Sequence, residues 1–173
     1  MYKRQDEKSP IKVIANGLPA SPGAVSGKVV FTSEEAERLN DMMQDTILVR
    51  VETSPEDIQG MHAAKGILTS RGGMTSHAAV VARGMGRPCV SGSSEIEINY
   101  DKKVFKTSSA EIKEGETITI DGSTGRIILG TVPTIKPEIS GDFSKLMSWA
   151  DKIRKLKVRT NSETPLDLSL IHI

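Results

Sequence analysis

Between residues 28 and 83, short β-prone runs alternate with segments that carry helix-start signals. Lys28–Thr32 and Thr46–Val51 are β-prone. Each is followed by residues typical of a helix N-terminus: Ser33 before two acidic residues, and Thr53–Asp57 with its Pro and acids. Interleaved strands and helices are characteristic of layered domains. This segment therefore predicts a compact α/β fold.

The flanking segments add elements to this prediction. A strand is expected at Gly66–Thr69, and a hairpin within Thr117–Leu129, where β-prone runs flank two glycine-bearing turns. A short helix is expected from His77 to Arg83, stopped by the glycines and the proline that follow. Gly17–Gly27 is rich in Gly and Pro, which favours a loop. Phe143–Leu156 has helical apolar spacing and predicts a final helix.

Composition limits the classes of function. The 173 residues suffice for one domain with a core, and 23 basic residues against 22 acidic ones give no field for nucleic acid. No apolar run is long enough to cross a membrane, and the first residues have no signal-peptide core. The single cysteine, Cys89, excludes an internal disulfide and a multi-cysteine metal site. We expect a cytoplasmic protein with no nucleic-acid or membrane partner.

The two ends are expected to be foreign to the domain. Residues 1–5 and 168–173 can both be back-translated into a transposon-end adaptor used in sequencing libraries, one orientation at each end. We therefore assign them to adaptor translation and exclude them, with His172, from fold reasoning. Residues 6–135 are predicted to form the domain, and residues 136–167 a linker helix leading out of it.

The stretch from Gly72 to His77 carries the chemistry. Two glycines let the backbone approach a bound group closely, and Thr75 and Ser76 are natural N-caps. They place His77 in the first turn of the predicted helix, where free N–H groups and the helix dipole favour an anion. No acidic residue follows at the capping-box positions. A phosphorylated imidazole at this position would meet ready donors, although such turns also begin many helices that bind nothing.

Residues 66–92 resemble the phosphohistidine segment of the pyruvate, phosphate dikinase family. The resemblance continues through GLPASPGAVSG, ILVRVETSPEDIQGMHAAKG, TIDGSTG and SGDFSKLMSWAD, and it ends after Asp167. Phosphoenolpyruvate synthase and enzyme I of the sugar phosphotransferase system share the module, but they typically have Arg where Met74 stands. The resemblance therefore favours the dikinases.

The resemblance implies a swivelling β/β/α phosphohistidine domain, followed by the start of a linker helix. In that family an ATP-grasp domain phosphorylates the histidine, and the carrier then hands phosphate to pyruvate in a barrel domain. Both domains are expected as missing partners of the same chain. ATP and Mg²⁺ are implied for the full-length enzyme, with no cofactor and no metal site in this fragment, which is not expected to be active alone.

By position, His77 matches the phosphorylated histidine of the family. Thr75 matches a threonine that a regulatory kinase-phosphorylase modifies in some members. Gly72, Gly73 and Ser76 are candidate phosphate-loop residues, and Arg71 is a candidate for neutralising the phosphate or simply an exposed loop cation.

Other candidates have simpler interpretations. His62 is expected to be structural, Met74 to serve packing or a lid, and Cys89 to be small and buried. Ser76 and His77 are unsuited to a nucleophile–base pair, because adjacent helical residues point about 100° apart. The alternatives that stay open are a carrier domain of phosphoenolpyruvate synthase or of another relay, and a non-catalytic anion-binding module.

Overall fold

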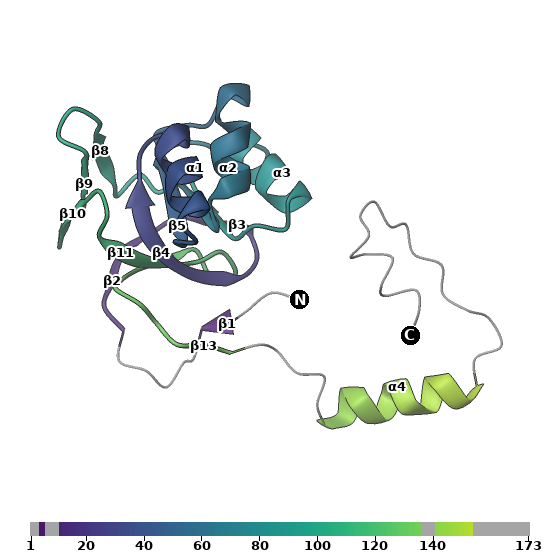
Figure 1. Ribbon diagram of the computed structural model, residues 1–173. Coiled ribbons are helices and arrows are strands. Elements are labelled where there is room, and N and C mark those ends of the chain that lie inside the picture. Colours follow the sequence, from purple (N-terminus) through teal and green to yellow (C-terminus); the bar gives the residue numbers. More distant parts are fainter. Residues whose placement is uncertain (1–3, 6–10, 136–140, 154–173) are drawn as a thin grey trace. The chain divides into compact units, whose positions relative to one another are not determined.

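The computed structural model describes residues 4–5, 11–135 and 141–153 (Figure 1). Contacts divide the chain into two units, residues 1–137 and 138–173, which are described separately. The strands are β1 (Arg4–Gln5), β2 (Val13–Asn16), β3 (Leu18–Ser21), β4 (Ala24–Val30), β5 (Thr46–Arg50), β6 (Gly66–Thr69), β7 (Cys89–Ser91), β8 (Glu97–Asn99), β9 (Val104–Lys106), β10 (Glu111–Lys113), β11 (Thr117–Asp121), β12 (Arg126–Leu129) and β13 (Thr134–Ile135). The helices are α1 (Ser33–Asp41), the 3₁₀ turn η1 (Pro55–Asp57), α2 (Ile58–Ala63), α3 (His77–Gly84) and α4 (Gly141–Ile153).

An eight-stranded mixed sheet forms the centre of the first unit, in the order β2-β12-β11-β4-β5-β6-β7-β3. The four strands β4 to β7 are parallel, whereas the pairings at both ends of the sheet are antiparallel. Its two edge strands, β2 and β3, are consecutive in the chain and joined only by Gly17. The sheet must therefore curl until its edges meet.

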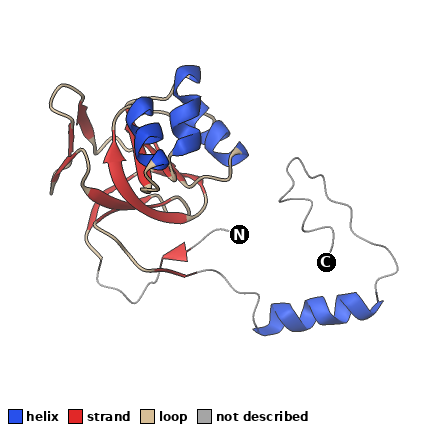
Figure 2. Cartoon of the chain, viewed as in Figure 1, coloured by secondary structure: helices blue, strands red, loops and turns tan. Residues whose placement is uncertain are grey.

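Apolar residues fill both sides of this curled sheet. Helices α1, α2 and α3 cover one face (Figures 1 and 2), and Ala36, Met61 and Ala79 pack there with Leu48 of β5. The other face holds a second cluster, in which Phe105 packs with Ile47. Phe105 belongs to β9, the middle strand of a three-stranded antiparallel sheet with β8 and β10. These layers confirm the predicted β/β/α arrangement of an α/β domain.

Most predicted elements are present, with one clear correction. Gly17–Gly27 was expected to be a loop, but it contains β3 and the start of β4. Pro19 is accommodated because β3 is an edge strand with a register irregularity next to it. Gly27 allows β4 to approach β5, since a Cβ there would lie 2.9 Å from the backbone of Thr46.

The first helix shows a smaller correction. Thr32, not Ser33, is its N-cap, and the Thr32 hydroxyl accepts a bond from the N–H of Glu35 at 3.2 Å. Ser33 instead donates to the carboxylate of Asp57 at 3.1 Å. The predicted helix at Phe143–Leu156 is present as α4 from Gly141 to Ile153, and its last predicted residues lie outside the described part of the chain.

The assignment of residues 1–5 and 168–173 to adaptor translation predicts that they pack on nothing in the domain core. Arg4 and Gln5 form β1, which pairs antiparallel with β13 in a separate two-stranded sheet. Arg4 and Gln5 therefore do contact another strand, but this two-stranded sheet is separate from the eight-stranded sheet. Residues 168–173 lie outside the described residues. Among the described helices, none is long and apolar enough to cross a membrane.

Candidate phosphohistidine site

His77 is the first residue of α3. Its predecessor Ser76 is the N-cap, with an extended backbone and a hydroxyl that accepts a bond from the N–H of Ala79 at 3.4 Å. No acidic residue lies in the first turn. The N–H groups of His77 and Ala78 precede the first internal helical bonds, so they remain available to an anion. The predicted position of His77 at a helix N-terminus is therefore present in the structure.

The imidazole of His77 contacts a residue that the sequence did not single out. Its Nδ1 lies 3.0 Å from the hydroxyl oxygen of Thr53, in the segment between β5 and η1. Nδ1 therefore has a hydrogen-bond partner inside the domain. This contact orients the ring and distinguishes its two nitrogens.

A buried carboxylate holds the Thr53 segment in place. Asp57 is 4% exposed, and its carboxylate accepts bonds from the N–H of Ser54 at 2.9 Å and from the hydroxyl of Ser33. The guanidinium of Arg50 lies 3.3 Å from the same carboxylate and donates to the carbonyl of Phe31. Because a buried charge requires such partners, these contacts constrain the backbone next to Thr53.

The loop before His77 turns sharply and packs closely on β7. Gly72 has a φ of 105°, which strongly favours glycine, and the N–H of Ser76 donates to the carbonyl of Gly73 at 3.0 Å. The buried hydroxyl of Ser91 donates to the same Gly73 carbonyl at 3.3 Å. A Cβ on Gly92 would lie only 2.3 Å from the carbonyl oxygen of Gly72. The glycines are thus required by conformation and by close backbone contact.

These parts enclose a cavity of about 250 Å³. It is lined by Glu52, Thr53, Arg71, Gly72, Ser76, His77 and Ala78. Four predicted site residues, Arg71, Gly72, Ser76 and His77, therefore meet in one place. Arg71 brings a positive charge, and in the part of the chain that the structure describes it forms no ion pair.

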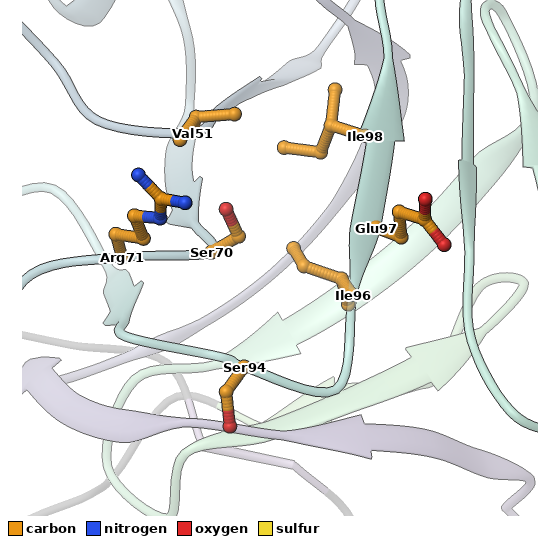
Figure 3. A pocket seen from close by; sticks show the side chains of 7 residues that line it. All are labelled: Val51, Ser70, Arg71, Ser94, Ile96, Glu97 and Ile98. Carbon is orange, nitrogen blue, oxygen red and sulfur yellow. The ribbon is translucent and has the colours of Figure 1, made fainter.

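Arg71 also lines a neighbouring cavity of about 380 Å³ (Figure 3). Figure 3 shows Arg71 and Ser70 on one side, opposite Ile96 and Ile98, with the carboxylate of Glu97 turned away from the guanidinium. The arginine side chain therefore lies between two hollows of the surface. Its position is suited to neutralising a group bound at His77.

The remaining candidates lie outside this cavity. Gly73 and Thr75 do not line it, although both belong to the same loop, and Thr75 is exposed. Met74 is 43% exposed, which is compatible with a lid role and not with core packing. His62 is exposed in α2. Cys89 is fully buried, as expected, and burial raises the pKa of its thiol to about 12.

Two lining residues, Glu52 and Thr53, were missed. Both belong to the ETSPED phrase, which served as a sign of relationship and as a helix start. Only the fold shows that this phrase reaches α3, because β5 and β6 are parallel neighbours whose following segments meet at the same edge. Within the described residues, no group of three His, Cys, Asp or Glu side chains is placed to hold a metal ion.

Comparison with known proteins finds a family that the middle of the chain resembles. Residues 42–125 match the family model described as PEP-utilising enzyme, mobile domain. This part of the chain is therefore similar to the mobile domain of PEP-utilising enzymes. This match includes both the Thr53 segment and His77.

Particular relatives are named pyruvate, phosphate dikinase. The chain is 57% identical to the one from Rhizobium meliloti (strain 1021) over 155 residues, and 58% identical to the one from Clostridium symbiosum over 156 residues. Pyruvate, phosphate dikinase 2 from Zea mays is also 58% identical. These matches cover 90% of this chain but only 17–18% of each relative. The chain thus corresponds to less than a fifth of the proteins that it resembles.

Among solved structures, the solution structure of Enzyme I (nEIt) is 23% identical and covers 65% of this chain and 40% of that chain. Its TM-score of 0.37 is too low to support an argument about fold.

Proposed function

We propose that this chain is the phosphoryl-carrier domain of a pyruvate, phosphate dikinase and that His77 bears the phosphoryl group. The position of His77 carries the proposal: it begins α3, lines the cavity and is bonded to Thr53. The high identity to proteins named as dikinases supports this carrier over that of phosphoenolpyruvate synthase or an anion-binding module without catalytic history.

The contact with Thr53 makes Nε2 the proposed reactive nitrogen, because Nδ1 is occupied by a hydrogen bond. If Nδ1–H donates to the Thr53 hydroxyl, Nε2 keeps its lone pair and is the nucleophile. In the opposite arrangement the hydroxyl donates to Nδ1, the proton lies on Nε2, and attack from Nε2 is blocked. Phosphoryl transfer to Nε2 therefore requires the first arrangement, in which the Thr53 hydroxyl is the acceptor.

The surroundings suit a dianionic phosphoryl group. The first-turn N–H groups of α3 contribute roughly 0.3–1 kcal/mol through the helix dipole, and more if the group is partly buried. Arg71 supplies a full positive charge at the same cavity. Glu52 lies on the cavity wall with the opposite charge and would repel the group if it approached closely. We assign Gly72, Gly73 and Ser76 to the loop that presents His77 to the phosphoryl group, and two of them, Gly72 and Ser76, line the cavity.

The proposed overall reaction converts ATP, phosphate and pyruvate into AMP, diphosphate and phosphoenolpyruvate. In the last step the enolate oxygen of pyruvate attacks phosphorus, so that the P–Nε2 bond breaks and the electron pair returns to His77. ATP, Mg²⁺ and pyruvate would bind to an ATP-grasp domain and a barrel domain elsewhere in the full-length protein. We place this reaction in the cytoplasm and assign residues 136–167, including α4, to the linker toward the barrel.

Complementation in trans tests this function. A full-length dikinase whose own carrier histidine is replaced by Ala would be mixed with this chain, and phosphoenolpyruvate formation would be followed. We expect formation to depend on added chain and on inorganic phosphate, and to be slow because the two proteins are not tethered. A folded His77→Ala chain is the matched control. Equal activity with both chains, or none with either, would contradict the proposal.

A further inference from the structure

Three contacts hold the carbonyl side of the histidine loop against the body of the domain. Ser91 donates to the carbonyl of Gly73, and the carbonyl of Gly72 lies against Gly92. The third contact comes from Arg83, whose Nη2 donates to the carbonyl of Met74. The carbonyls of Gly73 and Met74 are thus hydrogen-bonded, and the carbonyl of Gly72 packs closely against Gly92.

Arg83 makes this contact from a fixed position. Its Nε donates to the carbonyl of Ala20 in β3 at 2.8 Å, so the guanidinium bridges a strand and the loop with two different nitrogens. A planar guanidinium can do this because its donors lie in one rigid fork, whereas an ammonium group lacks that geometry. Arg83 therefore joins the loop to the edge strand of the sheet.

The orientation of the loop N–H groups follows from these contacts. In a trans peptide the C=O of one residue and the N–H of the next point in opposite directions. Holding the carbonyls of Gly72, Gly73 and Met74 inward therefore turns the N–H groups of residues 73–75 away from β3 and β7. Fixed donors of this kind stabilise an anion without reorganising when it arrives.

We propose that Arg83 is a positioning residue that fixes the loop carrying Gly72 and Ser76 beside a phosphorylated His77, without touching the phosphoryl group. The inference rests on the proposed function for its role, but the contact itself can be tested separately. It assigns to Arg83 a function that its exposed location at the end of α3 does not suggest. The neighbouring Arg87 provides a matched control, because it also donates to a carbonyl, that of His62 at 2.9 Å, away from the loop.

The test compares the unmodified 173-residue chain with Arg83→Gln, Arg83→Lys and Arg87→Gln. The chains would be phosphorylated chemically with phosphoramidate, which needs no partner domain, and ³¹P NMR would follow the titration of phosphohistidine at His77. Loss of fixed donors disfavours the dianion, so we expect the titration midpoint to rise in both Arg83 variants and to remain unchanged in Arg87→Gln. Arg83→Lys separates the effect of charge from that of geometry, because lysine retains the positive charge but lacks the planar guanidinium donors.

A midpoint that rises only in Arg83→Gln would show a charge effect and overturn the inference, as would unchanged midpoints in both variants. If the unmodified chain takes no phosphate on His77, the proposed function fails instead. In that case the heteronuclear NOE of amides 73–75 still tests whether Arg83 holds the loop in place. We expect this NOE to fall in both Arg83 variants and not in Arg87→Gln, and equal values in all chains would contradict the inference.

Discussion

The hydroxyl oxygen of Thr53 lies 3.0 Å from Nδ1 of His77, although the two residues are 24 positions apart in the chain. The contact joins the segment after β5 to the first turn of α3. It leaves Nε2 as the nitrogen that can face a phosphoryl donor. The position of Thr53 in turn depends on the buried Asp57 and on Arg50, which are ion-paired at 3.3 Å.

Replacing Thr53 by Val removes the hydroxyl and keeps the shape of the side chain. We expect the neutral imidazole of His77 to lose the partner of Nδ1 and phosphoryl acceptance to fall by up to about tenfold, the upper value of one hydrogen bond between neutral groups. Nitrogen-15 NMR of the ring and the rate of labelling would measure these effects. Thr53→Ser retains the hydroxyl and should behave like the unmodified chain. Equal rates for the Val and Ser variants would show that the contact is incidental.

Introducing a negative charge at Thr75 should block transfer to His77. Thr75 is exposed and two residues before His77, so a carboxylate there would repel an incoming phosphoryl group. We expect Thr75→Glu to lower the labelling rate by at least about tenfold relative to Thr75→Gln, which has the same size without charge. The comparison should weaken at high salt. If the Glu and Gln variants accept phosphate at the same rate, regulation through charge at Thr75 is ruled out.

Gly92 supports the histidine loop by its lack of a side chain. Its φ is 62°, and a Cβ would overlap with the carbonyl oxygen of Gly72 at 2.3 Å. We expect Gly92→Ala to lower the free energy of unfolding by about 3 kcal/mol or more, the sum of conformational strain and backbone displacement. Gly130→Ala is the control. Its φ of 77° is similar, but a Cβ added there would have no neighbouring atom within 4 Å.

Gly130→Ala should lower the free energy of unfolding by only about 1 kcal/mol, as measured by urea unfolding. Similar losses in both variants would show that close contact between Gly92 and Gly72 contributes nothing.

The sequence predicted the local parts of this site better than their assembly. Ser76 as N-cap and His77 in the first turn follow from residues adjacent in the chain, as does the hairpin of β11 and β12. The loop predicted for Gly17–Gly27 is wrong, because prolines and glycines also occur in edge strands and at close strand contacts. In the folded chain Pro19 lies in an edge strand, and Gly27 serves the close packing of β4 on β5.

Contacts between distant segments could not be predicted from local patterns. The pairing of Thr53 with His77 depends on the register of β5 and β6, and the bridge from Arg83 to Ala20 spans 63 residues. A helix start alone explains the residues Thr–Ser–Pro–Glu–Asp, so nothing in them indicates that Thr53 also contacts His77. The contact of Thr53 with His77 forms only when the parallel strands bring their ends together, and that of Arg83 with Ala20 only when β3 pairs with β7 at the edge of the sheet.

Cys89 should make stability depend on alkaline pH. Burial raises the pKa of its thiol from 9.0 to about 12, so above pH 9 the unfolded chain loses a proton that the folded chain retains. This stabilising contribution is present below pH 9 and is lost as pH rises toward 12. The difference in unfolding free energy between the unmodified chain and Cys89→Ala should therefore decrease by about 1.4 kcal/mol from pH 8 to pH 10. A constant difference would contradict the assigned burial of the thiol.

The most direct test of the central claim is the acid stability of phosphate bound to this chain. The chain would be labelled with radioactive phosphoenolpyruvate and a barrel domain from a dikinase relative, and the label would be followed in mild acid and in base. A phosphoramidate at His77 should be lost in acid and retained in base, and His77→Ala should remain folded and take no label. If the label survives acid, or if His77→Ala still acquires an acid-labile phosphate, His77 is not the carrier.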